Sequence, residues 1–213
     1  MLTISNETQK FLLKEYSKKH RHYHTYSHVC DVLDTLHENK ENIVNFQATE
    51  LAANFHDIVY EVGEEYRFNE QRSCLKFLEI IENDNPSMRY DLEDKDFQTA
   101  YLALLMIGAT HGHGFESIRN HKSLEPDQIN DISIFLDADL RILSRSRDKV
   151  IEFEEEIRKE FSIYSDEVYR SGRVAVLTSF LNRKKIYFSR IGFDWEEQAR
   201  DNIKFLIARL TNV

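Results

Sequence analysis

Histidine and aspartate residues are unevenly spaced along this chain of 213 residues, in positions that suit a metal site. The doublet His56–Asp57 follows the apolar stretch LAANF, and Asp139 lies inside the hydrophobic segment FLDADL. Four histidines, His24 and His28 among them, fall within nine residues. Imidazole and carboxylate together suit a borderline divalent cation, which lowers the pKa of a bound water and polarises a phosphoryl oxygen. The pattern predicts a hydrolytic metal centre.

Helices must position these side chains, because apolar residues recur with helical spacing along most of the chain. Val29, Val32, Leu33 and Leu36 lie at i, i+3, i+4 and i+7, on one helix face. The six glycines and two prolines are too few for the many tight turns of an all-β sandwich or barrel. The spacing predicts helices over 5–18, 25–40, 47–60, 67–83, 94–110, 126–143, 147–163, 166–189 and 194–211.

The domain organisation expected from length and loops is simple. A chain of this length fits one domain with a sizeable core. The segments 61–68, 84–93 and 112–124 are predicted loops, too short for interdomain linkers. We expect a single all-α domain over 1–213, in which C-terminal helices of about 166–211 pack on the core.

Charge and cysteine content limit which partners the protein is expected to bind and in which cellular compartment it is expected to lie. With 28 basic and 37 acidic residues the formal charge is −9, which disfavours binding of nucleic-acid polymers but permits a small anionic substrate beside a metal. Cys30 and Cys74 form no CxxC motif, as in a reducing compartment. The start MLTISNETQK lacks signal-peptide features, and the longest apolar run, 101–109, is about half a membrane span. We expect a soluble cytoplasmic protein without membrane contact.

A helical wheel distinguishes between neighbouring candidates. Asp139 falls on the apolar stripe of its predicted helix, whereas Asp137 points well over 100° from the centre of that stripe. A carboxylate on an apolar face is costly unless it is paired or bound to a metal. Asp139 is therefore the better ligand, and Asp137 supports a ligand or lies at the surface. His28 lies nearer its stripe than His24, although both can face one cavity.

The order H…HD…D resembles the HD superfamily of metal-dependent phosphohydrolases. The likeness extends from about residue 14 to 205, and it is greatest to a predicted group that has an R-x-Y-H-x-x-x-H block and an L-D-A-D-L block. The similar blocks are RHYHTYSHV (21–29), LAANFHDIVY (51–60), FNEQRSC (68–74), IGATHGH (107–113), FLDADLRIL (135–143) and GRVAVLTSFLNRKKIY (172–187).

The resemblance implies an HD-domain helical bundle with one divalent metal ion: Mn, Fe, Ni, Zn, Co or Mg. The implied ligands are His28, His56, Asp57 and Asp139, and His24 can also be aligned with the first of them. The implied substrate is a small phosphorylated molecule, a nucleotide or another phosphoester, attacked by a metal-activated water.

Further side chains are candidates for catalysis and for substrate contact. Asp57 is expected to act both as a ligand and as the acceptor of a water proton, and Glu70 to act as a general base or to orient the water. His113 follows a helix and can donate a proton, contact phosphate or bind a second metal. Arginines are expected on phosphate because they form bidentate contacts. The expected substrate contacts are Arg21, His24, His111, Arg173, Arg183 and Tyr187.

Three alternatives remain. A two-metal HD enzyme, either a phosphodiesterase or a di-iron oxygenase, would use further histidines and bind two ions per chain. A non-enzymatic module would bind a metal or nucleotide without turnover. An all-α scaffold with structural histidines would retain no stoichiometric metal after dialysis.

Overall fold

The chain is helical throughout the residues that the computed structural model describes, which are 1–91, 93–113 and 123–212. Within those residues there are nine α-helices and no strand, which confirms the all-α prediction. The helices are α1 (Asn6–Tyr16), α2 (Tyr26–Glu38), α3 (Phe46–Phe55), α4 (Asn69–Asp84), α5 (Lys95–Ala109), α7 (Pro126–Asp139), α8 (Arg147–Glu160), α9 (Asp166–Leu181) and α10 (Glu196–Thr211).

Side-chain caps fix where several helices begin. Ser5, Asn45, Asp94 and Ser165 each accept a hydrogen bond from a backbone N–H in the first turn of α1, α3, α5 and α9. Such caps satisfy N–H groups that have no partner within the helix. The helix starts therefore lie within about two residues of the predicted ones.

Helix ends differ more from prediction. The helix predicted over 166–189 stops at Leu181, and the backbone N–H groups of Phe188 and Ser189 donate instead to the carboxylate of Asp137. The helix predicted over 126–143 changes at Leu140 into a 3₁₀ turn. Including this turn, the connections between α-helices contain five short 3₁₀ helices in the described residues: Lys40–Asn42, Glu64–Phe68, His111–His113, Leu140–Ser144 and Ile191–Trp195.

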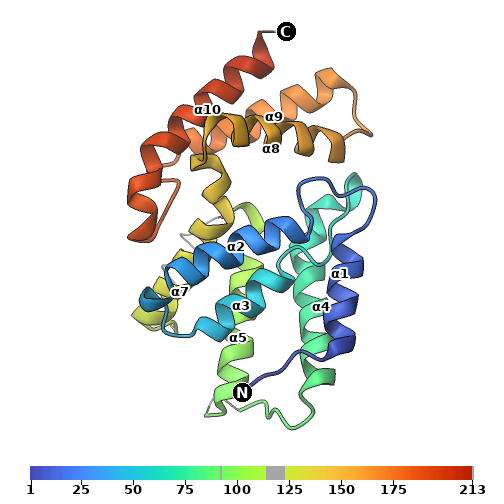
Figure 1. Cartoon of the computed structure of the whole chain (residues 1–213), viewed down its shortest axis with the longest axis vertical. Helices are drawn as coiled ribbons and strands as arrows, with labels where there is room; N and C mark the ends of the chain where they lie inside the picture. Colours follow the sequence, from blue (N-terminus) through green and yellow to red (C-terminus); the bar gives the residue numbers. More distant parts are fainter. Residues whose placement is uncertain (92, 114–122, 213) are drawn as a thin grey trace.

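Buried apolar residues form two clusters that divide the chain near residue 139. The first cluster joins α1 to α5 and α7, and the second joins the 3₁₀ turn Leu140–Ser144 to α8, α9 and α10. Figure 1 shows the second group of helices at the end of the molecule opposite the N-terminus. The C-terminal helices thus form an apolar cluster of their own.

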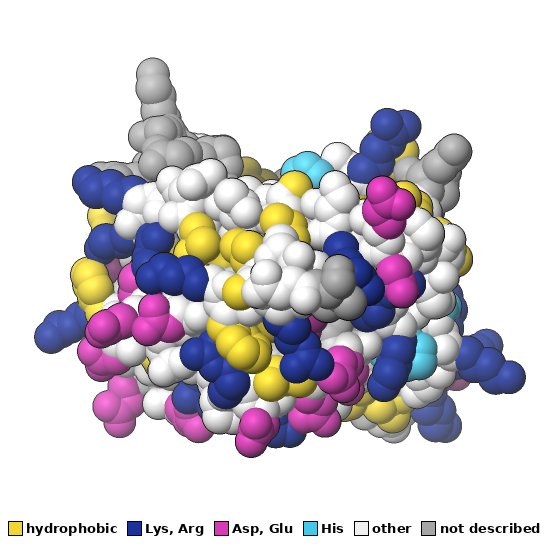
Figure 2. All heavy atoms as spheres, turned by 90° about the horizontal axis from the view of Figure 1, so that it is seen from above, with side chains coloured by type: hydrophobic (Ala, Val, Ile, Leu, Met, Phe, Trp, Pro, Cys, Tyr) yellow, Lys and Arg dark blue, Asp and Glu magenta, His cyan; other side chains and the backbone are white. Residues whose placement is uncertain are grey.

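The surface is mixed in charge at the end formed by the C-terminal helices. Figure 2 shows basic and acidic side chains interspersed around apolar ones there, without a continuous basic surface among the described residues of that face. Separately, none of the helices in the described part of the chain has the length and apolar character needed to cross a membrane.

Candidate metal centre

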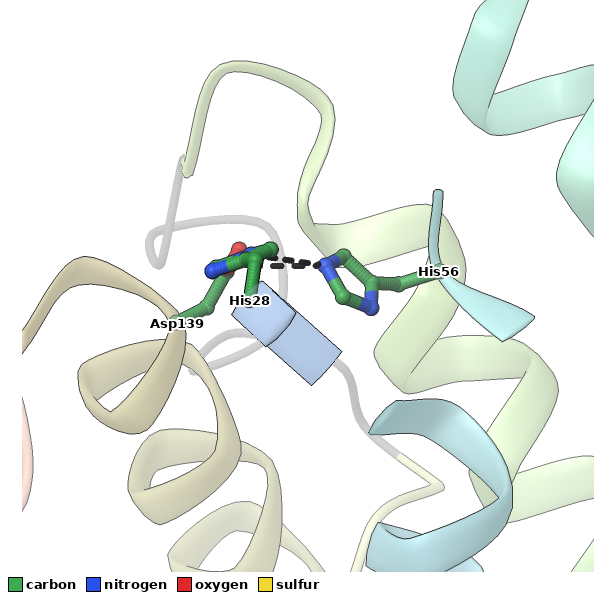
Figure 3. Close-up of side chains that lie close together, drawn as sticks. All are labelled: His28, His56 and Asp139. Atoms are coloured by element: carbon green, nitrogen blue, oxygen red, sulfur yellow. Dashed lines mark hydrogen bonds and ion pairs between the residues drawn. The ribbon is translucent and has the colours of Figure 1, made fainter. Parts of the chain in front are cut away.

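Two imidazoles and a carboxylate from distant parts of the chain meet where α2, α3 and α7 converge (Figure 3). The Nε2 atoms of His28 and His56 lie 3.3 Å apart. Oδ1 of Asp139 lies 2.9 Å from Nε2 of His28 and 3.5 Å from Nε2 of His56. These three residues form the metal cluster, a set of side chains that can hold a divalent ion.

Local structure orients each member of the metal cluster. His28 lies on the buried face of α2 beside Val29 and is 4% exposed. His56 directly follows α3, and its Nδ1 lies 2.9 Å from the carbonyl oxygen of Ala53. Because a carbonyl only accepts, Nδ1 carries the hydrogen and donates it, which leaves the Nε2 lone pair facing the cluster. Asp139 is the last residue of α7.

Asp57 adds a second carboxylate to the same point. Its Oδ2 lies 3.0 Å from Nε2 of His56 and 3.9 Å from Nε2 of His28. Ligand atoms bonded to an ion at about 2.1 Å lie about 3.0–3.4 Å from one another, close to these separations. His28, His56 and Asp139 therefore fit a divalent ion, and Asp57 lies beside them, in contact with His56 but outside the set of ligand atoms that all lie within 4.8 Å of one another.

The charges of the metal cluster reinforce one another. Burial alone would raise the pKa values of Asp57 and Asp139, yet the neighbouring imidazoles hold both pKa values well below their usual range. Burial would likewise lower the pKa of His56, but the two carboxylates raise it well above its ordinary value. Two ionised carboxylates in a largely dry site attract either a proton on imidazole or a divalent cation.

The histidines of the HGH segment occupy different places. Nε2 of His113 lies 2.9 Å from Oδ2 of Asp139, the carboxylate oxygen that does not face His28. His111 is exposed, and its Nδ1 lies 3.3 Å from Oε2 of Glu70. His113 thus supports the metal cluster, and the Glu70–His111 pair stands at the rim of the adjoining cavity.

That cavity has a volume of about 680 Å³ and lies between the two apolar clusters. His28, Asp57 and Asp139 line it on one side, and side chains of α8 and α9, such as Phe153 and Leu177, line it on the other. A cavity of this size accommodates a small organic molecule. The cavity gives a small molecule access to the metal cluster.

Arg21 is buried away from this cavity, which corrects our expectation of a phosphate contact. Its guanidinium donates to the backbone carbonyls of His24, Asp57 and Ile58 over 2.7–3.0 Å. Three carbonyl partners commit the side chain to joining the segment before α2 to the segment after α3. Arg21 therefore positions the HD doublet and lies outside the cavity lining.

Tyr187 and Asp137 also differ from expectation. Tyr187 is 2% exposed, donates its hydroxyl to the carbonyl of Leu140 and lies outside the cavity lining, so its expected substrate contact is corrected. Asp137 is 1% exposed rather than a surface group. It accepts hydrogen bonds from the backbone of Phe188 and Ser189 and from the Ser189 hydroxyl. Burial raises the pKa of Asp137 to about 7 despite these bonds.

Arg173 and Arg183 do line the cavity, but both have protein partners. Both terminal nitrogens of Arg183 donate to backbone carbonyls, those of Gly112 and His113, and so hold the HGH segment in place. Nε of Arg173 donates to Oε2 of Glu154 over 2.9 Å. Neither side chain is arranged as a free bidentate phosphate clamp.

Glu160 joins the two parts of the molecule and carries no signal in the sequence. One carboxylate oxygen accepts from three successive backbone N–H groups at residues 22–24, over 2.8–2.9 Å. The other oxygen accepts from the Tyr60 hydroxyl and contacts Nδ1 of His24 at 2.7 Å. His24 is thereby held outside the metal cluster, stacked on Tyr60, although it lines the cavity.

This network also shifts ionisation. Burial would raise the pKa of Glu160, but His24 and the backbone N–H groups lower it to about 2. Burial would lower the pKa of His24, but Glu160 raises it. The two groups thus favour an ion pair, formed across 136 residues of sequence.

Comparison with known proteins adds no relative to this description. The chain matches no protein-family model, no curated protein and no solved structure. The resemblance to the HD superfamily therefore rests on the sequence blocks alone, and function is argued from the geometry of the site.

Proposed function

We propose that this protein is a metal-dependent phosphohydrolase that acts on a small phosphoester. The observation that supports the proposal is the metal cluster at the wall of a ligand-sized cavity. His28, His56 and Asp139 would hold the ion, with Asp57 as a fourth ligand. When bound, the ion supplies a water of lowered pKa and a positive charge for one phosphoryl oxygen.

The side chains of this protein account for the proton transfers of the reaction. Hydrolysis joins a water oxygen to phosphorus and breaks the ester P–O bond, so that the water loses one proton and the leaving oxygen gains one. Asp57 has a carboxylate oxygen on the cluster side and accepts the water proton. His111, exposed at the rim and oriented by Glu70, donates a proton to the leaving oxygen.

His113 acts through another residue. It contacts one oxygen of Asp139 while the other faces His28, so it fixes the orientation of that carboxylate. Groups behind a metal ligand commonly tune its position and basicity. We therefore assign His113 as a positioning residue.

The first test removes Asp57. Dialysed protein should retain about one divalent ion per chain, measured by elemental analysis, and should release phosphate from a phosphoester panel. Asp57→Ala should lower phosphate release by about 10³-fold or more, because it removes both a ligand and the proton acceptor.

The matched control is Asp34→Ala, an exposed aspartate on α2, which should leave metal content and turnover unchanged. Circular dichroism establishes that both variants are folded. Full activity in folded Asp57→Ala, or the absence of stoichiometric metal in the native chain, would overturn the proposal.

One observation favours a second candidate, a two-metal enzyme. His113 places a third imidazole 2.9 Å from the metal cluster, on the far oxygen of Asp139. A carboxylate that bridges two ions would use both of its oxygens in this way. Elemental analysis separates the candidates. In a two-metal enzyme, His113→Ala would reduce the metal content from two ions per chain to one. In a one-metal enzyme, the same variant would keep its single ion.

A further inference from the structure

We infer that the substrate of this site is a phosphomonoester whose organic part is a flat, largely apolar group bearing one hydrogen-bond acceptor for Arg173. The inference rests on the proposed function and narrows its substrate class. It excludes nucleoside di- and triphosphates as preferred substrates. The wall of the cavity, its charge and one unpartnered buried nitrogen each support it.

Aromatic rings form a connected wall on one side of the cavity. The ring of His24 stacks on Tyr60 at 4.1 Å, and Tyr60 contacts Tyr66 at 6.4 Å. Tyr66 in turn meets Phe161 edge-on at 5.5 Å, and Phe161 stacks with Tyr164 at 6.2 Å. All five residues line the cavity. Rings at such separations favour a flat, apolar ligand.

The charge of the cavity suits one phosphoryl group. Apart from the histidines, the basic side chains among the described lining residues are Arg67, Arg173 and Arg183, and the last two already bind a carboxylate or carbonyls. Arg67 is exposed and lies over the ring of Phe68. An equal number of carboxylates lines the same cavity: Asp57, Glu70 and Asp139. A triphosphate requires several available cations, which this wall does not supply.

Arg173 provides a specific polar contact in the otherwise apolar part of the cavity. Its Nε is paired with Glu154, which also accepts from the Tyr169 hydroxyl at 2.5 Å, and its guanidinium lies 5.1 Å from the ring centre of Phe153. Its Nη2 has no hydrogen-bond partner among the described residues and no contact with solvent, so the guanidinium must turn toward the cavity to meet a ligand acceptor. An unsatisfied buried donor costs roughly 1–3 kcal/mol. A ligand acceptor at this nitrogen would remove that cost.

Gly172 keeps space open beside Arg173. It lies in the middle of α9, where glycine is about 1 kcal/mol less favourable than alanine. A Cβ built there would meet nothing within 4 Å, although the residue lines the cavity. Because Gly172 is exposed as well as part of the cavity lining, a large side chain there would extend across the open side of the cavity without disturbing the backbone.

The first experiment measures binding by titration calorimetry, without turnover. The probes are 2-naphthol and its 6-acetyl and 7-acetyl derivatives, which mimic the leaving group with and without an acceptor. At least one acetyl derivative should bind about tenfold more tightly than 2-naphthol, because its carbonyl meets Arg173. Arg173→Lys keeps a cation for Glu154 but lacks Nη2, so it should abolish that preference, and all three probes should bind this variant with equal affinity.

If Arg173 had only a structural role, Arg173→Lys would weaken the binding of all three probes by the same factor. That result would overturn the acceptor assignment. No binding of any naphthol overturns the inference as a whole. Because these titrations need neither metal nor catalysis, their outcome is independent of whether the phosphohydrolase proposal holds.

A second experiment separates substrate classes in the metal-loaded protein. The value of kcat/KM for 2-naphthyl phosphate should exceed that for a nucleoside monophosphate, and should exceed that for ATP at least tenfold. Gly172→Phe should abolish naphthol binding while metal content stays the same, and Gly172→Ala, which adds only one methyl group, should weaken binding less. Preferred hydrolysis of ATP, or normal naphthol binding by folded Gly172→Phe, would contradict the inference.

Discussion

Individual polar side chains hold this site together over long sequence separations. Arg21 and Glu160 are both buried and satisfy backbone groups rather than substrate. The sequence shows that such residues can donate or accept, but not which backbone groups will face them. For this reason the metal cluster was predictable from the HD blocks, whereas the roles of Arg21, Tyr187 and Glu160 were not.

Replacing Arg21 should destabilise the fold. Arg21→Ala leaves the carbonyls of His24, Asp57 and Ile58 without their buried donor, which we expect to lower the free energy of unfolding by about 2–4 kcal/mol. Urea titration of the metal-free protein measures this. The control is Arg89→Ala, a side chain 77% exposed, which should change the free energy of unfolding by less than about 0.5 kcal/mol. Equal effects would show that Arg21 is dispensable.

Glu160 should make stability depend on pH in the acid range. Its pKa falls from 4.5 to about 2 on folding, so its stabilisation is complete above pH 4.5 and is lost as the pH falls towards 2. This difference corresponds to roughly 3 kcal/mol. Glu160→Gln should thus be less stable than the native chain at pH 7, and the gap should close near pH 2. Urea titrations with chelator present test this, and a gap independent of pH would refute the assignment.

At the scale of elements, the helices were predictable because their apolar spacing is strong and their caps are local. Each of the nine described α-helices overlaps a predicted range, and none extends beyond it by more than one residue. The ends at Leu181 and Leu140 depend on contacts with distant segments, which spacing along the chain does not reveal. The same contacts bind the segment 182–195 to the end of α7 that carries Asp139.

Two glycines should respond oppositely to alanine. A Cβ at Gly192 would lie 2.4 Å from Cβ of Tyr187 and 2.7 Å from Oδ2 of Asp137, so Gly192→Ala must displace this segment. We expect a loss of about 2 kcal/mol in the free energy of unfolding and weaker metal binding. Gly172→Ala has open space and should gain about 0.5–1 kcal/mol. Thermal unfolding with and without metal measures both, and a neutral Gly192→Ala would contradict the close contact.

At the scale of the molecule, the two sides of the cavity are built by different apolar clusters. The metal cluster lies within the first apolar cluster and its flank, whereas α8 and α9 supply the opposite wall of the cavity. The two apolar clusters could not be predicted from sequence spacing, because periodicity identifies buried faces but not which faces share an interior.

Hydrogen exchange should resolve these two cores. A divalent metal alone should protect the backbone amides around α2, α7 and the end of α3, because its ligands lie there. Addition of 2-naphthol should extend protection to α8 and α9. Mass spectrometry of the exchanged chain follows this, with Asp139→Ala as the variant that loses the metal effect. Uniform protection by metal alone would indicate one cooperative unit.

The division near residue 139 also bears on how the site is first filled. A ribosome delivers a chain from its N-terminus, and domains fold broadly in that order. His28, His56 and Asp139 therefore leave the exit tunnel of the ribosome before α8 and α9 are available to cover them. An ion captured during synthesis reaches these side chains from open solvent, and the helices made afterwards enclose it.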